Sequence, residues 1–359
     1  MRVRPLFALT LFACTNFACT PSSPAKDDKA PSAGGEAKPT EAVAAKPVNA
    51  QNRASTECVG PFTDAPEKTL TIAGHEWHLQ GSTLTEKSHD PDETVAIGVV
   101  ADLKEDTPEN LTNIDRYVSF FRQEKAEFIF VDGDTGETKS QIANNLKRLA
   151  ASGLPVGIII GNRECESDFT AAVDEVATKL PNVFNLNRVR HIVMDDAEFV
   201  TLPGYYNPAY LHCMQKGCQY FDEDVQALAP LIEKAVHPVT LVSHGPPRQH
   251  APTGIDRISE GTNEGDPLLA KFMQEHHVPF GLFANIHEAG GHATDLGGDN
   301  MVRENVLVDS LYLNPGPGDA VRWQMNDSTE SIGMAAAVIY KGKQASYRTF
   351  RLSQLGKKH

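Results

Sequence analysis

The sequence predicts an α/β domain, because short apolar runs suited to buried strands alternate with stretches of helical period. A second observation is that several apolar runs end in Asp, Asn or His. A third is size, since 359 residues with 40% hydrophobic content can bury a large core. The clearest run, Phe128–Val131, leads straight into Asp132, Gly133 and Asp134. This pattern indicates a central parallel strand that presents a carboxylate at its C-terminal end.

Up to residue 180 the expected strands and helices alternate. Thr107 and Pro108 are typical of an N-cap and a first helical turn, Gly153 of a helix end and Ser167 of another N-cap. The expected elements are, in order, a hairpin over Leu70–Gln80, a strand over Val95–Val100, a helix from Thr107 to Arg122, the strand at Phe128, a helix over Lys139–Ala151, a strand over Val156–Ile160 and a helix from Ser167 to Lys179.

Beyond residue 180 short apolar runs with brief connections favour local antiparallel pairing. No internal repeat or second domain boundary interrupts the order of elements. The elements expected here are strands over Val183–Leu186, Ile192–Met194 and Phe199–Leu202, a helix over Asp222–Val236, a buried strand over Val239–Ser243, a helix over Asp266–His276, a strand over Phe280–Phe283, and a strand-rich end over Val306–Leu313 and Met334–Arg351.

The N-terminus is typical of an export signal, with a basic region at Arg2 and Arg4 and the apolar stretch Pro5–Ala18. Cys14 and Cys19 each follow an alanine, an arrangement that resembles a bacterial lipoprotein signal. We expect residues 1–19 to be the signal and Cys19, which opens onto a polar tail, to be lipidated. Cys14 is the alternative, and an ordinary secretory signal is another. The expected location is the cell envelope, periplasmic or outer-membrane, with a lipid anchor in the membrane.

Residues 20–56 are rich in Pro, Ala, Ser, Lys and Glu and hold almost no large apolar side chain. Such a stretch cannot bury enough surface to offset its ordering entropy, so we expect a disordered tether. The folded domain is expected over 57–354. Within it, Cys213 and Cys218 close a short polar loop, and we expect a disulfide between them in an oxidising compartment.

The charge of the chain narrows the range of partners. The formal net charge is −14 and the pI is about 5.4. Such a chain repels the phosphates of nucleic acids, so we expect no nucleic acid partner. No apolar run of membrane-spanning length follows the export signal in the sequence.

Five expected strands end in side chains that can bind a metal or a phosphate. Carboxylate, amide and imidazole ligands without thiolate suit Mn, Fe or Zn. Capping of the turns after the strands is the simpler role, and a common one for Asp. The repetition at five strand ends favours metal binding over that role. The five residues are Asp102, Asp134, Asn162, His244 and His287.

These residues lie in motifs that resemble those of the calcineurin-like metallophosphoesterase superfamily. That family carries D-x-H, G-D, G-N-H-E or G-N-H-D, a lone His and G-H-x-H at successive strand ends. The resemblance covers about Val95–Phe350 and includes an NPG turn at Asn314. The matching stretches are Asp102-Leu103-Lys104, Gly133-Asp134, Gly161-Asn162-Arg163-Glu164, His244 in SHGPPR, and Asn285-Ile286-His287.

The resemblance implies a four-layer α/β/β/α sandwich of two mixed sheets flanked by helices. It also implies a centre for one or two divalent metal ions across the sheet edges, and a phosphoester substrate. It places Asp102, Asp134 and His287 at the first metal position. The second position has Asp134, Asn162, His244 and Asn285.

Three positions depart from the motifs of the family. Lys104 and Asn285 stand where the family has ligand histidines, and Arg163 stands where it has a histidine that acts at the transition state. A protonated lysine has no lone pair for a metal. We therefore expect Lys104 and Arg163 to act catalytically as cations on the phosphate, although Arg163 cannot serve as a general acid. Arg248, just past His244, is expected to contact an anionic substrate.

Two functions follow from this reading. The first hypothesis is a metal-dependent hydrolase of phosphomonoesters or diesters in the cell envelope, with a metal-activated water as nucleophile. The second is a non-catalytic lipoprotein of the same fold that binds a metal, a phosphate ligand or a partner.

Overall fold

The computed structural model describes residues 58, 67–89, 91–213 and 216–353. All of them belong to one unit, Asn49–His359. The expected export signal over 1–19, with Cys19, and the expected tether over 20–56 lie outside the described residues. Within the described part, no helix is long and apolar enough to cross a membrane.

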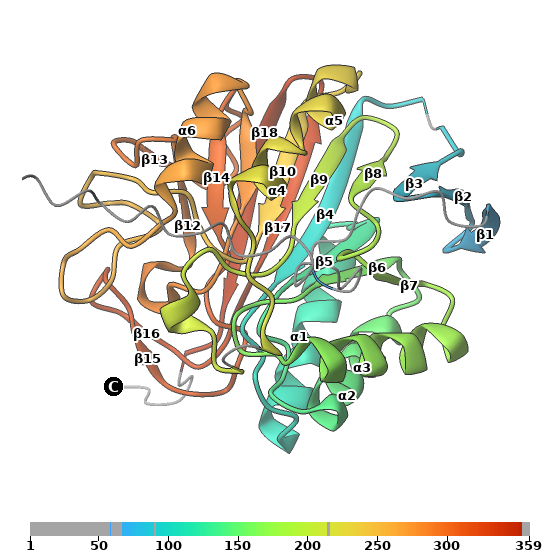
Figure 1. Ribbon diagram of the computed structural model, residues 1–359, viewed down its shortest axis with the longest axis horizontal. Coiled ribbons are helices and arrows are strands. Elements are labelled where there is room, and N and C mark those ends of the chain that lie inside the picture. The colour runs from blue at the N-terminus through green and yellow to red at the C-terminus, as the bar shows by residue number, and fades with distance from the viewer. Residues whose placement is uncertain (1–57, 59–66, 90, 214–215, 354–359) are drawn as a thin grey trace, which may run out of the picture. The chain divides into compact units, whose positions relative to one another are not determined.

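Two large mixed β-sheets form the centre of the fold (Figure 1). The six-stranded sheet has the order β18 (Gln344–Arg351), β17 (Met334–Lys341), β4 (Thr94–Val100), β5 (Phe128–Asp132), β6 (Val156–Ile159), β7 (Val183–Asn185). The ten-stranded sheet has the order β1 (Lys68–Ile72), β2 (His75–Gln80), β3 (Thr83–Glu86), β8 (His191–Val193), β9 (Glu198–Leu202), β10 (Val239–Ser243), β11 (Phe280–Leu282), β14 (Leu311–Asn314), β12 (His292–Thr294), β13 (Met301–Val302). A separate pair consists of β15 (Trp323–Gln324) and β16 (Glu330–Ser331).

Each large sheet contains a block of parallel strands. In the six-stranded sheet, β4, β5, β6 and β7 are parallel, and β17 is antiparallel to β4. In the ten-stranded sheet, β9, β10, β11 and β14 are parallel. Strands that are parallel end at the same edge of their sheet. The residues after β4, β5 and β6 therefore lie side by side, and so do those after β10 and β11.

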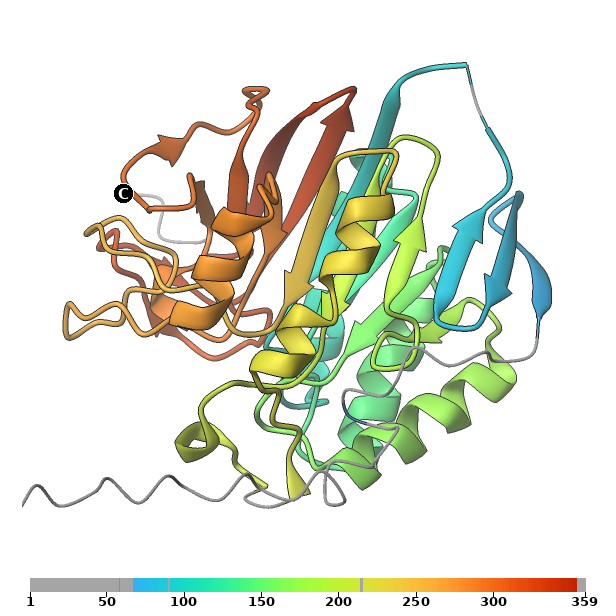
Figure 2. The ribbon, with the colours of Figure 1, turned by 45° about the horizontal axis from the view of Figure 1, so that its top comes forward.

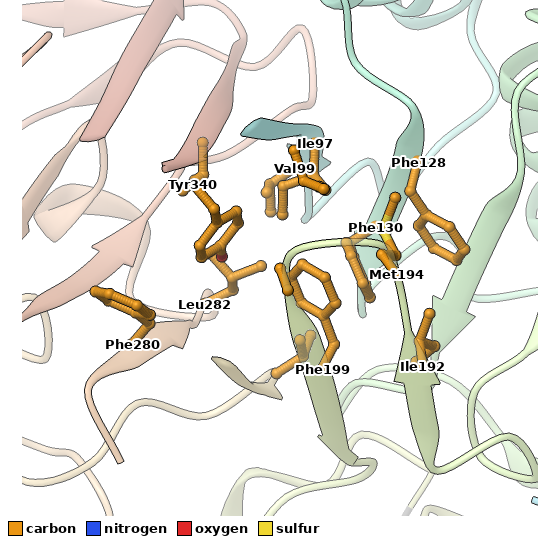
Figure 3. Close-up of a cluster of buried hydrophobic side chains, with 14 of the residues drawn as sticks. Ile97, Val99, Phe128, Phe130, Ile192, Met194, Phe199, Phe280, Leu282 and Tyr340 are labelled. Atoms are coloured by element: carbon orange, nitrogen blue, oxygen red, sulfur yellow. The ribbon is translucent and has the colours of Figure 1, made fainter. Parts of the chain in front are cut away.

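The two sheets pack face to face through alternate residues of their strands. In β5, Phe128 and Phe130 belong to the cluster between the sheets, whereas Ile129 and Val131 belong to the cluster under the helices. The ring of Phe130 lies 4.7 Å from that of Phe199 in β9, centroid to centroid (Figure 3). The side chains of all five residues of β5 are at most 1% exposed, so this strand is buried on both faces.

Helices cover the outer faces of both sheets, on opposite sides of the molecule (Figures 1 and 2). The layer order is therefore α/β/β/α, and the predicted fold class is confirmed. Two short 3₁₀ helices are η2 (Pro208–Tyr210) and η4 (His287–Ala289). The six-stranded sheet is covered by α1 (Pro108–Gln123), α2 (Lys139–Ala150) and α3 (Glu166–Lys179), and the ten-stranded sheet by α4 (Asp222–Gln226), α5 (Ala229–Lys234) and α6 (Pro267–Glu275).

Three local predictions differ from the structure. The helix expected over Asp222–Val236 is divided into α4 and α5, because Pro230 lacks an N–H and its ring would clash with the carbonyl of Gln226 in a continuous helix. Helix α3 begins one residue before Ser167, with Cys165 as its N-cap. Strand β7 pairs in parallel with β6, while the antiparallel pairing expected in this region holds for β8 and β9.

The predicted disulfide between Cys213 and Cys218 is wrong. Cys58 is bonded to Cys218 and Cys165 to Cys213, with Cα–Cα distances of 5.3 and 5.2 Å. Cys218 is fully buried in the cluster between the six-stranded sheet and its helices. Cys213 is instead bonded to the N-cap residue of α3, Cys165. The two cysteines of this loop therefore face different parts of the fold, although they are close in sequence.

Candidate metal centre

The C-terminal ends of β4, β5 and β10 bring three ligating side chains together. One ligand atom each from Asp102, Asp134 and His244 lies within 4.8 Å of the other two. All three residues are at most 1% exposed. The cluster thus joins two strands of the six-stranded sheet to one strand of the ten-stranded sheet.

Asp134 lies at the centre of this cluster. Its Oδ1 accepts the backbone N–H of Arg163 at 2.9 Å and lies 3.3 Å from His244 Nε2. Close packing explains two glycines around it. A Cβ at Gly133 would lie 2.5 Å from His244 Nδ1, and one at Gly161 would collide with Asp134 Oδ1. Only glycine lets these backbones approach the ligating side chains so closely.

His244 presents Nε2 to the cluster. Its Nδ1 lies 2.7 Å from the carbonyl oxygen of Asp132, which can only accept, so Nδ1 donates. Nε2 lies 2.9 Å from Asn162 Oδ1, and the amide nitrogen of Asn162 donates to the carbonyl of Tyr210 at 2.8 Å. A metal-binding histidine commonly donates its other ring N–H to a carbonyl. His244 and Asn162 are thus oriented with a nitrogen and an oxygen toward one point.

Asp102 and His287 form the other side of the centre. His287 Nε2 lies 3.0 Å from Asp102 Oδ1, and the side chains are 16% and 1% exposed. His287 begins the 3₁₀ helix η4, a few residues beyond the end of β11. Four of the strand-end residues predicted from the sequence therefore make direct contacts in two pairs, His244 with Asn162 and His287 with Asp102.

The electrostatics of the centre favour a bound cation. Burial alone would lower the pKa of His244, but the carboxylates of Asp134 and Asp102 raise it to about 10. Burial would raise the pKa of Asp102, yet His287 and Lys104 hold it well below its usual range. Two buried carboxylates at one point require a positive charge, either a proton on His244 or a cation. The oxygen and imidazole donors fit Mn, Fe or Zn.

Comparison with solved structures places this architecture among known folds, with 76 matching chains. No family model matches the chain, and no curated protein matches its sequence. One crystal structure matches with a TM-score of 0.51 and 12% identity, over 72% of this chain and 100% of that chain. A purple acid phosphatase from yellow lupin (Lupinus luteus) seeds matches with TM-score 0.47 and 12% identity, over 77% of this chain and 56% of its own. A dimetal phosphatase from Danio rerio matches with TM-score 0.42 and 11% identity, over 72% and 99%.

The chain therefore shares its overall fold with the first of these structures. At such low identities the likeness concerns the fold alone, so the chemistry of the site has to be judged from its own residues.

Lys104 lies beside the candidate metal centre. Its Nζ donates to Asp319 Oδ2 at 3.0 Å and lies 4.4 Å from the centre of the Trp323 ring. The indole Nε1 of Trp323 donates to the other oxygen of Asp319 at 2.8 Å, and the ring lies 4.1 Å from that of His287. The sequence does not single out Asp319 or Trp323, because neither lies in a motif. Together they hold the ammonium near Asp102 and His287.

Arg163 and Asn285, the other two departures, each have a protein partner. The guanidinium Nε of Arg163 lies 3.5 Å from Asp134 Oδ2, its Nη1 pairs with Glu137, and the side chain is 25% exposed. The amide nitrogen of Asn285 donates to the hydroxyl of Tyr205 at 2.8 Å. Arg163 therefore adjoins the cluster with a positive charge, while Asn285 is oriented by Tyr205.

Arg248 is held within its own loop. Its Nε donates to the carbonyl of Gly265 at 2.7 Å and lies 4.0 Å from Asp256 Oδ2. The side chain is 41% exposed, so part of the guanidinium faces solvent. Contact of Arg248 with a substrate stays a prediction.

A cavity of about 370 Å³ adjoins the centre. Lys104, Arg163, Asp319 and Trp323 contribute to its lining. Its size falls in the range of small-molecule sites. The cavity therefore offers room for a small phosphoester beside the cluster, with an indole ring and a guanidinium in its wall.

Two further buried carboxyl groups lie next to the centre. Neither oxygen of Asp132 has a hydrogen-bond partner among the described residues, and burial raises its pKa to about 8. Glu164 accepts the N–H groups of Thr135 at 2.5 Å and Gly161 at 2.9 Å, and burial together with the charge of Asp134 raises its pKa to about 8. Glu164 thus joins the loops after β5 and β6. The acid-glycine-acid pattern is the only sequence signal for Asp132.

Proposed function

We propose that this chain is a metal-dependent phosphoester hydrolase. The observation that carries the proposal is the meeting of Asp102, Asp134 and His244 at one buried point, with ligand atoms within 4.8 Å of one another. Asn162 and His287 stand beside this point, 2.9 Å from His244 and 3.0 Å from Asp102. Carboxylate, amide and imidazole donors from both sheets form a set that fits a divalent ion.

The donors divide into two positions that share Asp134. Asn162 and His244 complete one, with Asn285 as a weaker additional donor, and Asp102 and His287 complete the other. A divalent ion bound here would lower the pKa of a water and polarise a phosphoryl oxygen.

The chain's own cations bind and orient the phosphate. Arg163 lines the cavity, and a guanidinium can hold two phosphoryl oxygens at once. Lys104 places positive charge beside Asp102 and so offsets part of the negative charge of the centre. Because Arg163 stays protonated, it does not protonate a leaving group. We therefore expect aryl phosphates, which have good leaving groups, to react faster than alkyl phosphates.

Hydrolysis of an aryl phosphate monoester and diester by the purified full-length chain, loaded with Mn, tests the proposal. We expect turnover that a chelator abolishes and that Asp134→Ala removes. Asp115→Ala, which changes a half-exposed aspartate of α1, is the matched control and should keep full turnover. A metal-loaded chain without turnover on a broad panel of phosphoesters would contradict hydrolysis.

The non-catalytic alternative has one observation in its favour. Both cations expected at the phosphate already have anionic partners, since Lys104 pairs with Asp319 and Arg163 with Glu137. A binding protein would hold metal without turnover, and inorganic phosphate would raise its melting temperature.

Display at the cell envelope is also a proposal, and it depends on the composition of residues 1–56 alone. If Cys19 carries the lipid, Cys19→Ser should move the chain from the membrane fraction to the soluble fraction, while Cys14→Ser should leave it in the membrane. The reverse result would assign the lipid to Cys14.

A further inference from the structure

A second group of metal-capable side chains lies at the opposite end of β5. His75 begins β2, Glu86 ends β3, and Glu127 directly precedes β5. One ligand atom of each lies within 4.8 Å of the other two. Glu127 and Asp134 flank β5 at its two ends, so roughly 20 Å of strand separates this group from the metal centre.

Glu86 is the buried member of the group, and only one of its two carboxylate oxygens has a hydrogen-bond partner among the described residues. Only 3% of the residue is exposed. Its Oε1 pairs with His75 Nδ1, but its Oε2 has no hydrogen-bond partner among the described residues. A buried carboxylate oxygen without a donor is costly, and native proteins rarely leave one. A bound cation at this point would satisfy it.

The three side chains border a cavity of about 110 Å³, which has room for an ion. His89 and Asp195 pair with each other in the same lining. No lysine or arginine is among the described residues that line it, which are Gly74, His75, Glu86, Ser88, His89, Glu127 and Asp195. Carboxylate and imidazole groups gathered in one small cavity favour a divalent cation.

We propose that His75, Glu86 and Glu127 form a structural site for a divalent cation of the Zn²⁺ type. One imidazole nitrogen and two carboxylates are donors that zinc accepts, and the cavity leaves space for a water as fourth ligand.

Such an ion would connect the two sheets. His75 and Glu86 belong to the ten-stranded sheet, whereas Glu127 leads into the six-stranded sheet. Strands β1–β3 form one end of the ten-stranded sheet (Figure 1). The backbone N–H of Ala96 donates to Glu127 Oε1 at 3.2 Å, which fixes this ligand to β4. The ion would therefore tie the end of the ten-stranded sheet to the N-terminal end of β5, a central strand of the six-stranded sheet.

The test uses the full-length chain carrying Asp134→Ala, so that the metal centre described above does not contribute. Bound zinc is measured after dialysis, and the visible spectrum is recorded with Co²⁺ in place of zinc. We expect one zinc per chain in this background and its loss in His75→Ala, Glu86→Gln and Glu127→Gln. His78→Ala is the matched control, because His78 lies on the same strand and pairs with exposed Glu67, and it should keep the zinc.

Zinc should also raise the melting temperature of the background chain and of His78→Ala by several degrees, but not that of the three ligand variants. Melting in a chelator shows whether a variant folds. Glu127→Gln changes a partly exposed side chain and carries the test if Glu86→Gln does not fold. A background chain that binds no zinc, or folded ligand variants that keep it, would reduce this group to a partly exposed histidine paired with a buried glutamate and overturn the proposal.

Discussion

At the residue scale, neighbouring side chains of one type acquire different charges from their surroundings. Asp132 and Asp134 are two positions apart and both buried. Burial raises the pKa of Asp132 to about 8. Burial also acts on Asp134, but His244 and the backbone N–H of Arg163 outweigh it and lower the pKa of Asp134. Asp134 therefore stays ionised and can hold a cation, whereas Asp132 accepts a proton.

Because Asp134 serves both metal positions, its loss should matter more than that of Asp102. We expect Asp134→Ala to remove both ions and Asp102→Ala to remove one. The fall in affinity should exceed the roughly 10- to 100-fold that is typical for residues behind the ligands. Metal content measured by elemental analysis after dialysis against Mn checks this. Equal losses in both variants would show that Asp134 does not bridge the two positions.

Lys104 and Asp319 form a buried ion pair, with side chains 7% and 2% exposed. Removing one member of such a pair leaves an uncompensated charge, so we expect Lys104→Met to lower the free energy of unfolding by about 3 kcal/mol. Adding Asp319→Asn neutralises the second member and keeps an acceptor for Trp323. The double variant should recover part of the loss in urea unfolding with a chelator present. Equal stability of the single and double variants would mean that the two charges do not interact.

At the element scale, the geometry of the centre depends on the backbone after each strand. Asp102, Asp134, Lys104 and Asn285 have positive φ angles of 53°, 53°, 60° and 63°. Residues other than glycine rarely adopt positive φ angles, and those that do are often found at functional sites. Hydrogen bonds between neighbouring strand ends hold the conformation, from Asp102 N–H to the carbonyl of Gly133 at 3.1 Å and from Lys104 N–H to that of Asp134 at 2.9 Å.

A comparison of two glycines distinguishes the effect of backbone strain from the effect of crowding at the centre. Gly133 and Gly153 have φ angles of +82° and +80°, but only Gly133 has a neighbour, His244, where a Cβ would go. We expect Gly153→Ala to lower the free energy of unfolding by about 1 kcal/mol from strain alone. Gly133→Ala should cost more and should also weaken Mn binding, because His244 has to move. Urea unfolding and metal titration of both variants measure this, and similar effects would exclude crowding as the cause.

Glu198 in β9 predicts how stability depends on pH. Burial raises its pKa, but hydrogen bonds from His191 at 2.7 Å and from the N–H groups of His237 at 3.0 Å and Val236 at 2.6 Å outweigh burial and lower it below 4.5. Because its pKa is lower in the folded than in the unfolded state, ionised Glu198 stabilises the fold fully above pH 4.5. This stabilisation is lost as the pH falls through the folded pKa. Glu198→Gln should cost about 1–3 kcal/mol at pH 7 and flatten this acid dependence.

Exposed Glu93, which directly precedes β4, supplies the control, since Glu93→Gln should leave both the free energy of unfolding and its acid dependence unchanged. Unfolding in urea at several pH values between neutral and acid gives the free energies. A Glu198→Gln chain that loses stability in acid as steeply as the natural chain would assign the dependence to another group.

At the scale of the whole molecule, the sequence predicted the features of the fold that a local pattern of residues encodes. Apolar runs that end in Asp, Asn or His identified β4, β5, β6 and β10, and parallel pairing brings such ends together. The layer order came from the resemblance of motifs. Lys104 and Asp319 are 215 positions apart, and no local pattern pairs them. For the same reason proximity in sequence misled the prediction for Cys213, whose partner is set by how α3 packs.

The two disulfides make a prediction about the whole fold. The bond between Cys58 and Cys218 spans 160 positions, and that between Cys165 and Cys213 spans 48. Because a cross-link restricts the unfolded chain more when its loop is longer, replacing each pair by serines should cost about 5 and about 4 kcal/mol, respectively. Urea unfolding of the oxidised chain gives the costs. Digestion without reductant should yield the two cross-linked peptide pairs, and a peptide linking Cys213 to Cys218 would refute this connectivity, because one cysteine cannot serve both bonds.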